Sequence, residues 1–104
     1  MSDDGTLSHY VILLADDVEE ITWEDAKAWA AERGGELPTR REQSLLFANL
    51  KDEFESAWYW SGEVHEDNSG WAWCQFFGHG GQSYYRQSYR LRARAVRRFI
   101  PSVI

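Results

Sequence analysis

The sequence predicts a single α+β domain in which two helices pack on an antiparallel sheet, without disulfides. Two segments in the first half combine helix caps with apolar positions at helical spacing. The second half is rich in β-favouring aromatic residues, with 12 of the 16 aromatics between Phe54 and Phe99. A chain of 104 residues can bury one core, and its single cysteine, Cys74, excludes an internal disulfide.

The start of the chain divides into a polar end and a first strand. Residues 1–8 are polar and are predicted to form a flexible N-terminus, so residues 9–104 are assigned to the domain. The apolar run from His9 to Leu14 has the length of a covered strand. The acidic cluster from Asp16 to Glu20 is predicted to be a solvated connection, because it lacks the ligand spacing of a calcium loop.

The first helix is predicted from its boundaries. Thr22 is an N-cap candidate with Asp25 three residues later, and Gly34-Gly35 provides a C-terminal stop. Trp29 continues the helical spacing between these limits. We therefore expect a helix from about Thr22 to Arg33.

A second helix is predicted after a short extended link at Leu37-Pro38. Thr39 is its N-cap, and Glu42 occupies the capping-box position. An apolar stripe of Leu46, Phe47 and Leu50 is expected to face the core.

The β half begins with a strand over Ala57–Ser61, which Gly62 is expected to end. Residues 63–69 are predicted to be a polar loop. An aromatic strand from Gly70 to Phe77 follows, and residues 78–81 form a glycine-rich turn before β-favouring residues resume at Tyr84.

The closing segment alternates arginines with small apolar residues. This period of two predicts that Leu91, Ala93 and Ala95 point inward together with Tyr89, while Arg90 and Arg92 point outward. Of Tyr84 and Tyr85, which are neighbours on one strand, one must face away from the core.

The net charge of −6 hides a division between two halves. All 17 acidic residues lie at or before Asp67 with only five basic ones, whereas six arginines and no acid follow it. The favoured interpretation is that the halves fold against each other and their charges interleave. The alternative is two differently charged surfaces.

The segment from Thr22 to Thr39, with its Gly-Gly-Glu-Leu-Pro-Thr end, resembles the C-type-lectin-like fold. Tyr59-Trp60-Ser61-Gly62 and the ending at Arg94-Ala95-Val96-Arg97 resemble the uncharacterised bacterial and phage branch allied to the Legionella collagen-like protein C-terminal domain. The resemblance covers about residues 9–99 and implies that the first and last strands are neighbours. It also implies that Trp29, Trp60 and Trp73 are largely buried, and that Arg94 and Arg97 are structural.

No cofactor and no metal are expected. The calcium and sugar triplets of animal C-type lectins are absent, and Glu63, Glu66, Asp67 and Asn68 form a polar loop of the kind that is usually solvated. Cys74 and His79 lack the additional ligands of a metal site and an acid to orient the histidine. No catalytic residue is therefore assigned.

Binding is the function that these residue types favour, because tyrosine with arginine is typical of protein-recognition surfaces. The predicted partner-binding residues are Trp71, Tyr84, Tyr85, Arg86, Arg90 and Arg92. The arginines and aromatics would also suit nucleic acid, but the acidic remainder of the chain argues against it. No membrane association is expected, and the tyrosines and arginines have the alternative role of core filling and surface solvation.

The resemblance implies a phage- or prophage-encoded inhibitor of a host or defence protein, acting in the bacterial cytoplasm. A virion receptor-binding component is one alternative. A DNA mimic that uses the acidic half to occupy a nucleic-acid-binding protein is another. A mixed surface with an exposed tyrosine and arginine patch would favour protein binding, whereas a contiguous acidic strip would favour mimicry.

Overall fold

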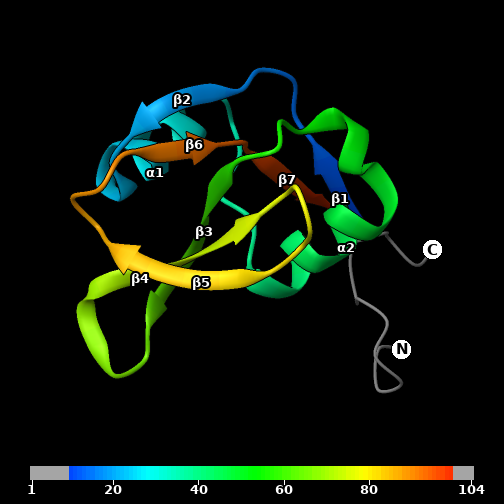
Figure 1. The fold of residues 1–104 in the computed structure, drawn as a ribbon. Coiled ribbons are helices and arrows are strands. Elements are labelled where there is room, and N and C mark those ends of the chain that lie inside the picture. The colour runs from blue at the N-terminus through cyan, green and yellow to red at the C-terminus, as the bar shows by residue number, and fades with distance from the viewer. Residues whose placement is uncertain (1–9, 100–104) are drawn as a thin grey trace.

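The structure is a computed structural model that describes residues 10–99. The predictions for residues 1–8, for His9 and for residues 100–104 lie outside the described residues. The chain is one α+β domain with two α-helices, one short 3-10 helix and seven strands in this range (Figure 1). The elements in chain order are β1 (Tyr10–Leu13), β2 (Val18–Ile21), α1 (Trp23–Glu32), α2 (Arg40–Leu50), η1 (Lys51–Glu53), β3 (Trp58–His65), β4 (Asn68–Phe76), β5 (Gln82–Arg86), β6 (Leu91–Ala93) and β7 (Val96–Phe99).

The strands form a five-stranded sheet in the order β2-β6-β3-β4-β5 and a separate pair of β1 with β7. The first and last strands are therefore antiparallel neighbours, with Tyr10 opposite Phe99, which confirms their expected pairing. The expectation of an antiparallel sheet is wrong at one place, because β6 runs parallel to β3, with Tyr59 opposite Arg92. The β6 strand lies between β2 and β3, antiparallel to β2 and parallel to β3. The pairings of β3 with β4 and of β4 with β5 are antiparallel.

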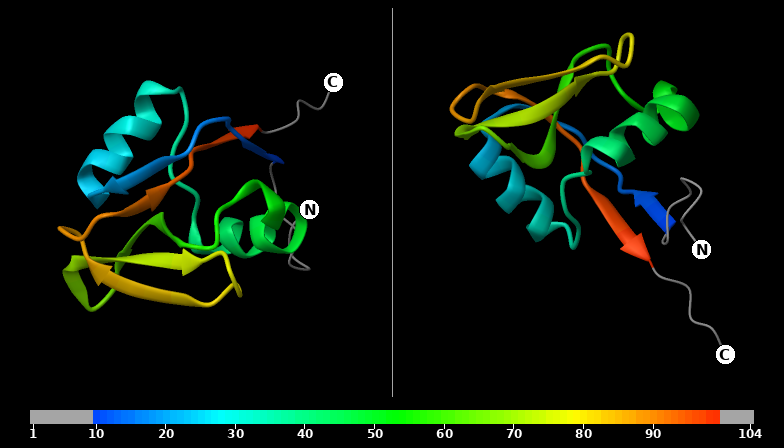
Figure 2. Two further views of the ribbon diagram at one scale, coloured as in Figure 1. Left: turned by 45° about the horizontal axis from the view of Figure 1, so that its top comes forward. Right: turned by 90° about the horizontal axis from the view of Figure 1, so that it is seen from below.

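Both predicted helices are present, and their caps are confirmed. The Thr22 side chain accepts a hydrogen bond from the Asp25 backbone N–H at 3.4 Å. Thr39 and Glu42 form the expected capping box at the start of α2. Gly34 takes a φ of +77° after the end of α1, a conformation that favours glycine. The two helices lie apart from each other in the views of Figure 2.

Two boundary predictions are wrong. Gly62 does not end a strand, because β3 continues to His65 and pairs with β4, leaving only Glu66 and Asp67 between the two strands. The predicted loop over residues 63–69 is therefore mostly part of a hairpin. Leu50 does not face the core but is 40% exposed, because it lies at the last turn of α2.

The core consists of two clusters on either side of β3. The larger cluster surrounds Trp60, and the smaller one joins Tyr59 to α2 and to the β1–β7 pair. Trp60 is fully buried as predicted, but Trp29 and Trp73 are only partly buried. Trp23, which directly follows the α1 cap, is 4% exposed and donates its indole N–H to the Ser61 carbonyl.

The charges of the two halves interleave, as the favoured interpretation of the charge division expected. Arg92 pairs with Asp17 and Glu19, and Arg98 pairs with Glu36 and Glu42. The acidic cluster from Asp16 to Glu20 is consequently not a simple solvated connection. Part of it is strand β2, and the carboxylates of Asp16, Asp17 and Glu19 are held by arginines.

The structural arginines near the end of the chain bind backbone carbonyls. The Arg94 side chain donates to the carbonyls of Leu14 and Glu53, and Arg97 donates to that of Gly34. Arg94 is only 8% exposed, so the strict alternation of outward arginines ends at Ala93, where β6 ends.

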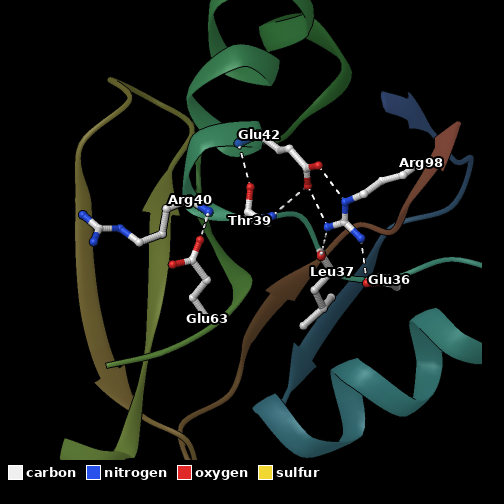
Figure 3. A network of polar contacts seen from close by, with 7 residues as sticks. All are labelled: Glu36, Leu37, Thr39, Arg40, Glu42, Glu63 and Arg98. Carbon is white, nitrogen blue, oxygen red and sulfur yellow. Dashed lines mark hydrogen bonds and ion pairs between the residues drawn. The ribbon is translucent and has the colours of Figure 1, made fainter. Parts of the chain in front are cut away.

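Arg98 makes the network shown in Figure 3. Its guanidinium binds both carboxylate oxygens of Glu42, at 2.7 and 2.8 Å, together with Glu36 and the Leu37 carbonyl. This network holds the last strand, β7, against the start of α2.

Neither α-helix within residues 10–99 has the length and apolar character needed to cross a membrane.

Candidate protein-binding face

The structure divides the six predicted partner-binding residues among three places. Trp71, Tyr84 and Arg86 lie on one face of the β4–β5 pair, where Trp71 is opposite Arg86. Tyr85 points to the other face and packs on Trp58 of the larger core cluster. The remaining two, Arg90 and Arg92, lie before and within β6, which two strands separate from β5 in the sheet.

The face that holds Trp71, Tyr84 and Arg86 also contains three residues that the sequence analysis did not assign. We call the whole set the Trp73 face, and its members are Arg40, His65, Trp71, Trp73, Tyr84 and Arg86. They come from α2, β3, β4 and β5. Residues that are two apart on a strand share a face, which explains why Trp71 joins Trp73 and why Tyr84 joins Arg86.

The rings of the Trp73 face contact one another closely. Tyr84 lies between the two tryptophans, with ring centroids 5.5 Å from Trp71 and 5.2 Å from Trp73, both edge to face. His65 stacks on Trp73 at 5.3 Å and contacts Tyr84 at 4.3 Å. Such aromatic pairs restrict each other's rotation, so the face presents fixed rings rather than mobile side chains.

The arginine guanidinium groups lie over the indole rings. The Cζ atom of Arg40 is 3.5 Å from the Trp73 ring centroid, and that of Arg86 is 5.6 Å from the Trp71 ring centroid. Cation–π stacking of this kind leaves the edge of the guanidinium free to bind an acceptor. In Figure 3 the Arg40 side chain extends away from the Arg98 network, towards β4 and β5.

A chain of glutamines fixes Arg40 in this position. Gln82 accepts from Arg40 Nε at 3.1 Å and donates to the Arg40 carbonyl and to Gln75. Gln75 is fully buried and donates to the carbonyl of Gln43, which donates in turn to backbone carbonyls of β3. Buried, hydrogen-bonded amides of this kind hold α2 against the sheet and so set the place of Arg40.

Two further hydrogen bonds fix the position of the Trp73 face, one at the start of α2 and one at the β3–β4 hairpin. The backbone N–H of Arg40 donates to Glu63 at 2.8 Å (Figure 3), and the Trp73 indole N–H donates to Glu66 at 3.0 Å. Hydrogen bonds from its own backbone N–H and from Trp73 hold the pKa of the Glu66 carboxyl below its usual value.

The most accessible members of the Trp73 face are the two that lie on β5. The tyrosine ring of Tyr84 is 41% exposed and Arg86 is exposed, whereas Trp71, Trp73 and His65 are half-buried. This mixture of fixed aromatic rings and arginine is what protein-recognition surfaces favour.

The second group of predicted residues has a different environment. Tyr89 is 49% exposed, so its predicted inward position is wrong. The cause is that β6 begins only at Leu91, and the alternation does not extend back into the preceding turn. Arg90 is exposed as predicted, but only 25% of the Arg92 side chain is exposed because Asp17 and Glu19 bind it.

Arg90 and Arg92 should therefore differ in their contribution to stability. Replacing Arg92 by alanine is expected to lower the free energy of unfolding by about 1 kcal/mol, because it removes two ion pairs and leaves Asp17 without its arginine. The matched change Arg90→Ala should leave it nearly unchanged. Urea denaturation of both variants measures this, and equal effects would contradict the structural role given to Arg92.

Three polar side chains of the β3–β4 hairpin accept hydrogen bonds from other groups of the protein. Glu63 and Glu66 accept the hydrogen bonds described above, and Asn68 accepts from the Gly70 N–H at 3.1 Å. Within residues 10–99 no group of three or more histidine, cysteine, aspartate or glutamate side chains is placed to hold a metal ion.

Cys74 and His79 occupy unrelated environments. Cys74 is fully buried and contacts the Ser83 carbonyl, and burial raises the pKa of its thiol to about 12. His79 is exposed in the turn after β4 and accepts from the Gly81 N–H. A thiol with this pKa is protonated at neutral pH and so does not have the properties of a nucleophilic cysteine.

The hydroxyl of Tyr59 leads us to expect a loss of folding stability at alkaline pH. Burial, followed by the hydrogen bond to Asp17, raises the pKa of Tyr59 from 10.0 to about 12. Because the folded state favours the neutral phenol, its contribution to stability is complete below pH 10 and is lost as the pH rises towards 12. The change Tyr59→Phe should make the fall in stability over this interval shallower.

Urea denaturation at a series of alkaline pH values measures this slope, and Tyr84→Phe is the matched control because Tyr84 is exposed. Cys74 also titrates in this interval but is present in all three proteins, so its effect cancels. Parallel curves for the wild type and Tyr59→Phe would contradict the prediction.

Sequence reasoning expected Trp73 to be largely buried, and it missed Arg40, His65 and the glutamines that support the face. His65 was assigned no role, because residues 63–69 were predicted to be a loop, whereas His65 pairs with Asn68 in the β3–β4 hairpin. Arg40 was assigned no role, although its position beside the capping residue Thr39 places it at the first turn of α2. The glutamines had no recognisable motif, since they interact over separations of 7 to 42 residues.

No protein-family model matches the chain, and no curated protein matches its sequence.

Proposed function

We propose that the chain is a non-catalytic protein-binding module that recognises its partner with the Trp73 face. The observation that carries this proposal is the joint exposure of Tyr84 and Arg86 beside Trp71, on strands that fix all three. Tyrosine and tryptophan provide large contact areas at a low cost in side-chain entropy, and arginine provides a planar donor.

The proposal includes a C-type-lectin-like architecture and the setting that the resemblance implies, a phage- or prophage-encoded inhibitor of a host or defence protein. The pairing of β1 with β7 and the two capped helices support this architecture. The DNA-mimic alternative loses support, because Arg33 and Arg92 neutralise carboxylates of the cluster from Asp16 to Glu20. A mimic needs such carboxylates to remain as open negative charges.

The proposal is tested by affinity capture from a bacterial lysate with two matched double variants. Tyr84→Ala with Arg86→Ala changes the Trp73 face, and Tyr89→Ala with Arg90→Ala changes an equally exposed tyrosine and arginine in the following turn. We expect the wild type and the second variant to capture the same protein and the first variant to lose it. Truncation of hot-spot residues typically costs about 2 kcal/mol or more each.

Both variants should keep the wild-type melting temperature, which separates binding from folding. Loss of the captured protein with the Tyr89 and Arg90 variant alone would place the binding surface at the turn between β5 and β6. Retention by both variants, or reproducible capture of nothing by the wild type, would contradict the proposed function.

A further inference from the structure

We propose that the outer edge of β5 and the Trp73 face together bind one extended, carboxylate-bearing segment of the partner, which adds to the sheet as a sixth strand. This inference rests on the proposed function and names the chemistry of the partner. The arguments come from the backbone of β5, from its side chains and from the two arginines of the face.

The first argument is that β5 is an edge strand. It lies at the end of the strand order and pairs with β4 in continuous register from Gln82 opposite Gln75 to Arg86 opposite Trp71. Within residues 10–99 no strand covers its other side. An edge of this kind presents backbone donors and acceptors to another strand.

The direction of those backbone groups follows from the ladder. Phe76 N–H donates to the Gly81 carbonyl and Gln87 N–H donates to the Gly70 carbonyl, so residues 81 and 87 face β4 at the two ends of the pair. Backbone groups alternate in direction along a strand, so those of Gln82, Tyr84 and Arg86 point away from β4. The Arg86 carbonyl is taken by the Tyr89 N–H. Among contacts within residues 10–99, the backbone groups of β5 that remain without a partner are therefore the N–H and C=O of Gln82 and Tyr84 and the N–H of Arg86.

The second argument is that this edge lacks the usual protection against strand addition. Its sequence, Gln-Ser-Tyr-Tyr-Arg, has no proline, and its register with β4 has no bulge. Natural edge strands are commonly protected by such features or by inward-pointing charges. The one charged residue, Arg86, instead belongs to the Trp73 face.

The third argument is charge. Within residues 10–99 no acceptor binds the Nη nitrogens of Arg40, and no hydrogen bond or ion pair engages the Arg86 side chain. Arg86 lies at one end of β5, while Arg40 is joined to Gln82 at the other end. Guanidinium groups bind carboxylates through two parallel hydrogen bonds, which makes a carboxylate their natural ligand.

These positions define a pattern in the added strand. A residue opposite Tyr84 contacts its ring across the strand pair, and aromatic and β-branched residues give the best contacts of this kind. Residues two positions away on the same face lie near the two arginines. The expected motif is acid, any residue, aromatic or β-branched residue, any residue, acid.

A single-stranded nucleic acid would use the same rings and arginines, but the structure favours a polypeptide. A nucleic acid has no alternating donors and acceptors to continue the β5 ladder. Nucleic acid is therefore an outcome of the test rather than part of the proposal.

The experiment measures binding of the intact chain to an array of synthetic heptapeptides. One set has the core Glu-x-Z-x-Glu and the other Lys-x-Z-x-Lys, where Z is varied over all amino acids and x is serine, threonine or valine. A fluorescent oligothymidylate is the nucleic-acid probe. We expect binding to the first set with aromatic and β-branched residues preferred at Z, and about tenfold weaker binding after Arg40→Ala or Arg86→Ala.

Backbone pairing is tested separately with the tightest peptide of the first set. Methylating the amides on one edge of the peptide should abolish binding, while methylating those on the other edge should leave it nearly unchanged, because only one edge pairs with β5. In the protein, Tyr84→Pro should bind about fivefold more weakly than Tyr84→Ala, since proline removes an outward N–H. If Tyr84→Pro does not fold, the methylated peptides still decide the question.

The inference is wrong if the acidic set does not bind, if the basic set binds equally well, or if both methylated peptides behave alike. Tighter binding of the oligothymidylate than of every peptide would also overturn it and assign the face to nucleic acid. If a captured partner depends on Tyr84 and Arg86 while the acidic peptides fail, the proposed function stands and only the strand-addition inference is rejected.

Discussion

Replacing Trp60 by alanine is expected to lower the free energy of unfolding by about 3–5 kcal/mol, a large part of the stability of a small domain. The side chain is fully buried in the larger core cluster, where Trp23, Ala26 and Leu37 are among the buried residues. The change leaves a cavity among these residues, which cannot close it without moving α1 or β3. Urea denaturation measures the loss directly.

The indole of Trp60 also joins two strands, because its N–H donates to the Ile21 carbonyl at the end of β2 at 2.9 Å. Trp60→Phe keeps much of the volume and removes this hydrogen bond, so it should cost less than Trp60→Ala. Trp71→Ala is the matched control, because Trp71 lies half-exposed on the Trp73 face. A loss for Trp60→Ala no larger than for Trp71→Ala would contradict the position of Trp60 in the core.

The second large effect is expected at the pair of Arg98 and Glu42. Replacing Arg98 by alanine should lower the free energy of unfolding by about 3–5 kcal/mol, because it removes the cation that binds both carboxylate oxygens of the buried Glu42. The Glu42 residue is 1% exposed, and one of its oxygens also accepts from the Thr39 N–H. The Glu42 hydrogen bonds raise the pKa of Arg98 above its usual value, so the arginine stays charged over the whole working pH range.

A double-mutant cycle with Arg98→Met and Glu42→Gln separates the pair from the rest of the network. The double variant should be more stable than Arg98→Met alone, since it also removes the buried negative charge that Arg98 binds and keeps an acceptor for the Thr39 N–H. Arg97→Ala is the matched control, because Arg97 is exposed and donates to a single backbone carbonyl. Additive effects in the cycle would show that Arg98 and Glu42 do not act together.

Local patterns were sufficient to predict both helices. The caps at Thr22 and Thr39 and the stop at Gly34 operate within one or two turns of chain, so they were readable from neighbouring residues. The same reasoning predicted the turn after Phe77 and the opposite directions of Tyr84 and Tyr85. Periodicity failed where an element ended sooner than the pattern, as at Leu50 and Tyr89.

The candidate site was predicted only in part from the sequence. Trp71, Tyr84 and Arg86 were selected by residue type, and their common face depends on the register of β4 with β5, which the sequence did not specify. Arg40 and His65 join them because α2 packs against the sheet and because β3 continues through Gly62. These contacts join residues far apart in the chain, and no local pattern encodes them.

The sequence by itself determined the fold class, the helix boundaries and the kinds of side chain available for binding, because capping, propensity and hydrophobic spacing are local properties. Only the tertiary structure decided which arginines are paired with carboxylates and which remain available to bind a partner. Arg92 and Arg98 have the same formal charge as Arg86, but the first two are paired with carboxylates brought from the other half of the chain. Arg86 lies on the edge strand β5 with its guanidinium over the Trp71 ring, and its position there follows from the order of the strands and the register of β4 with β5.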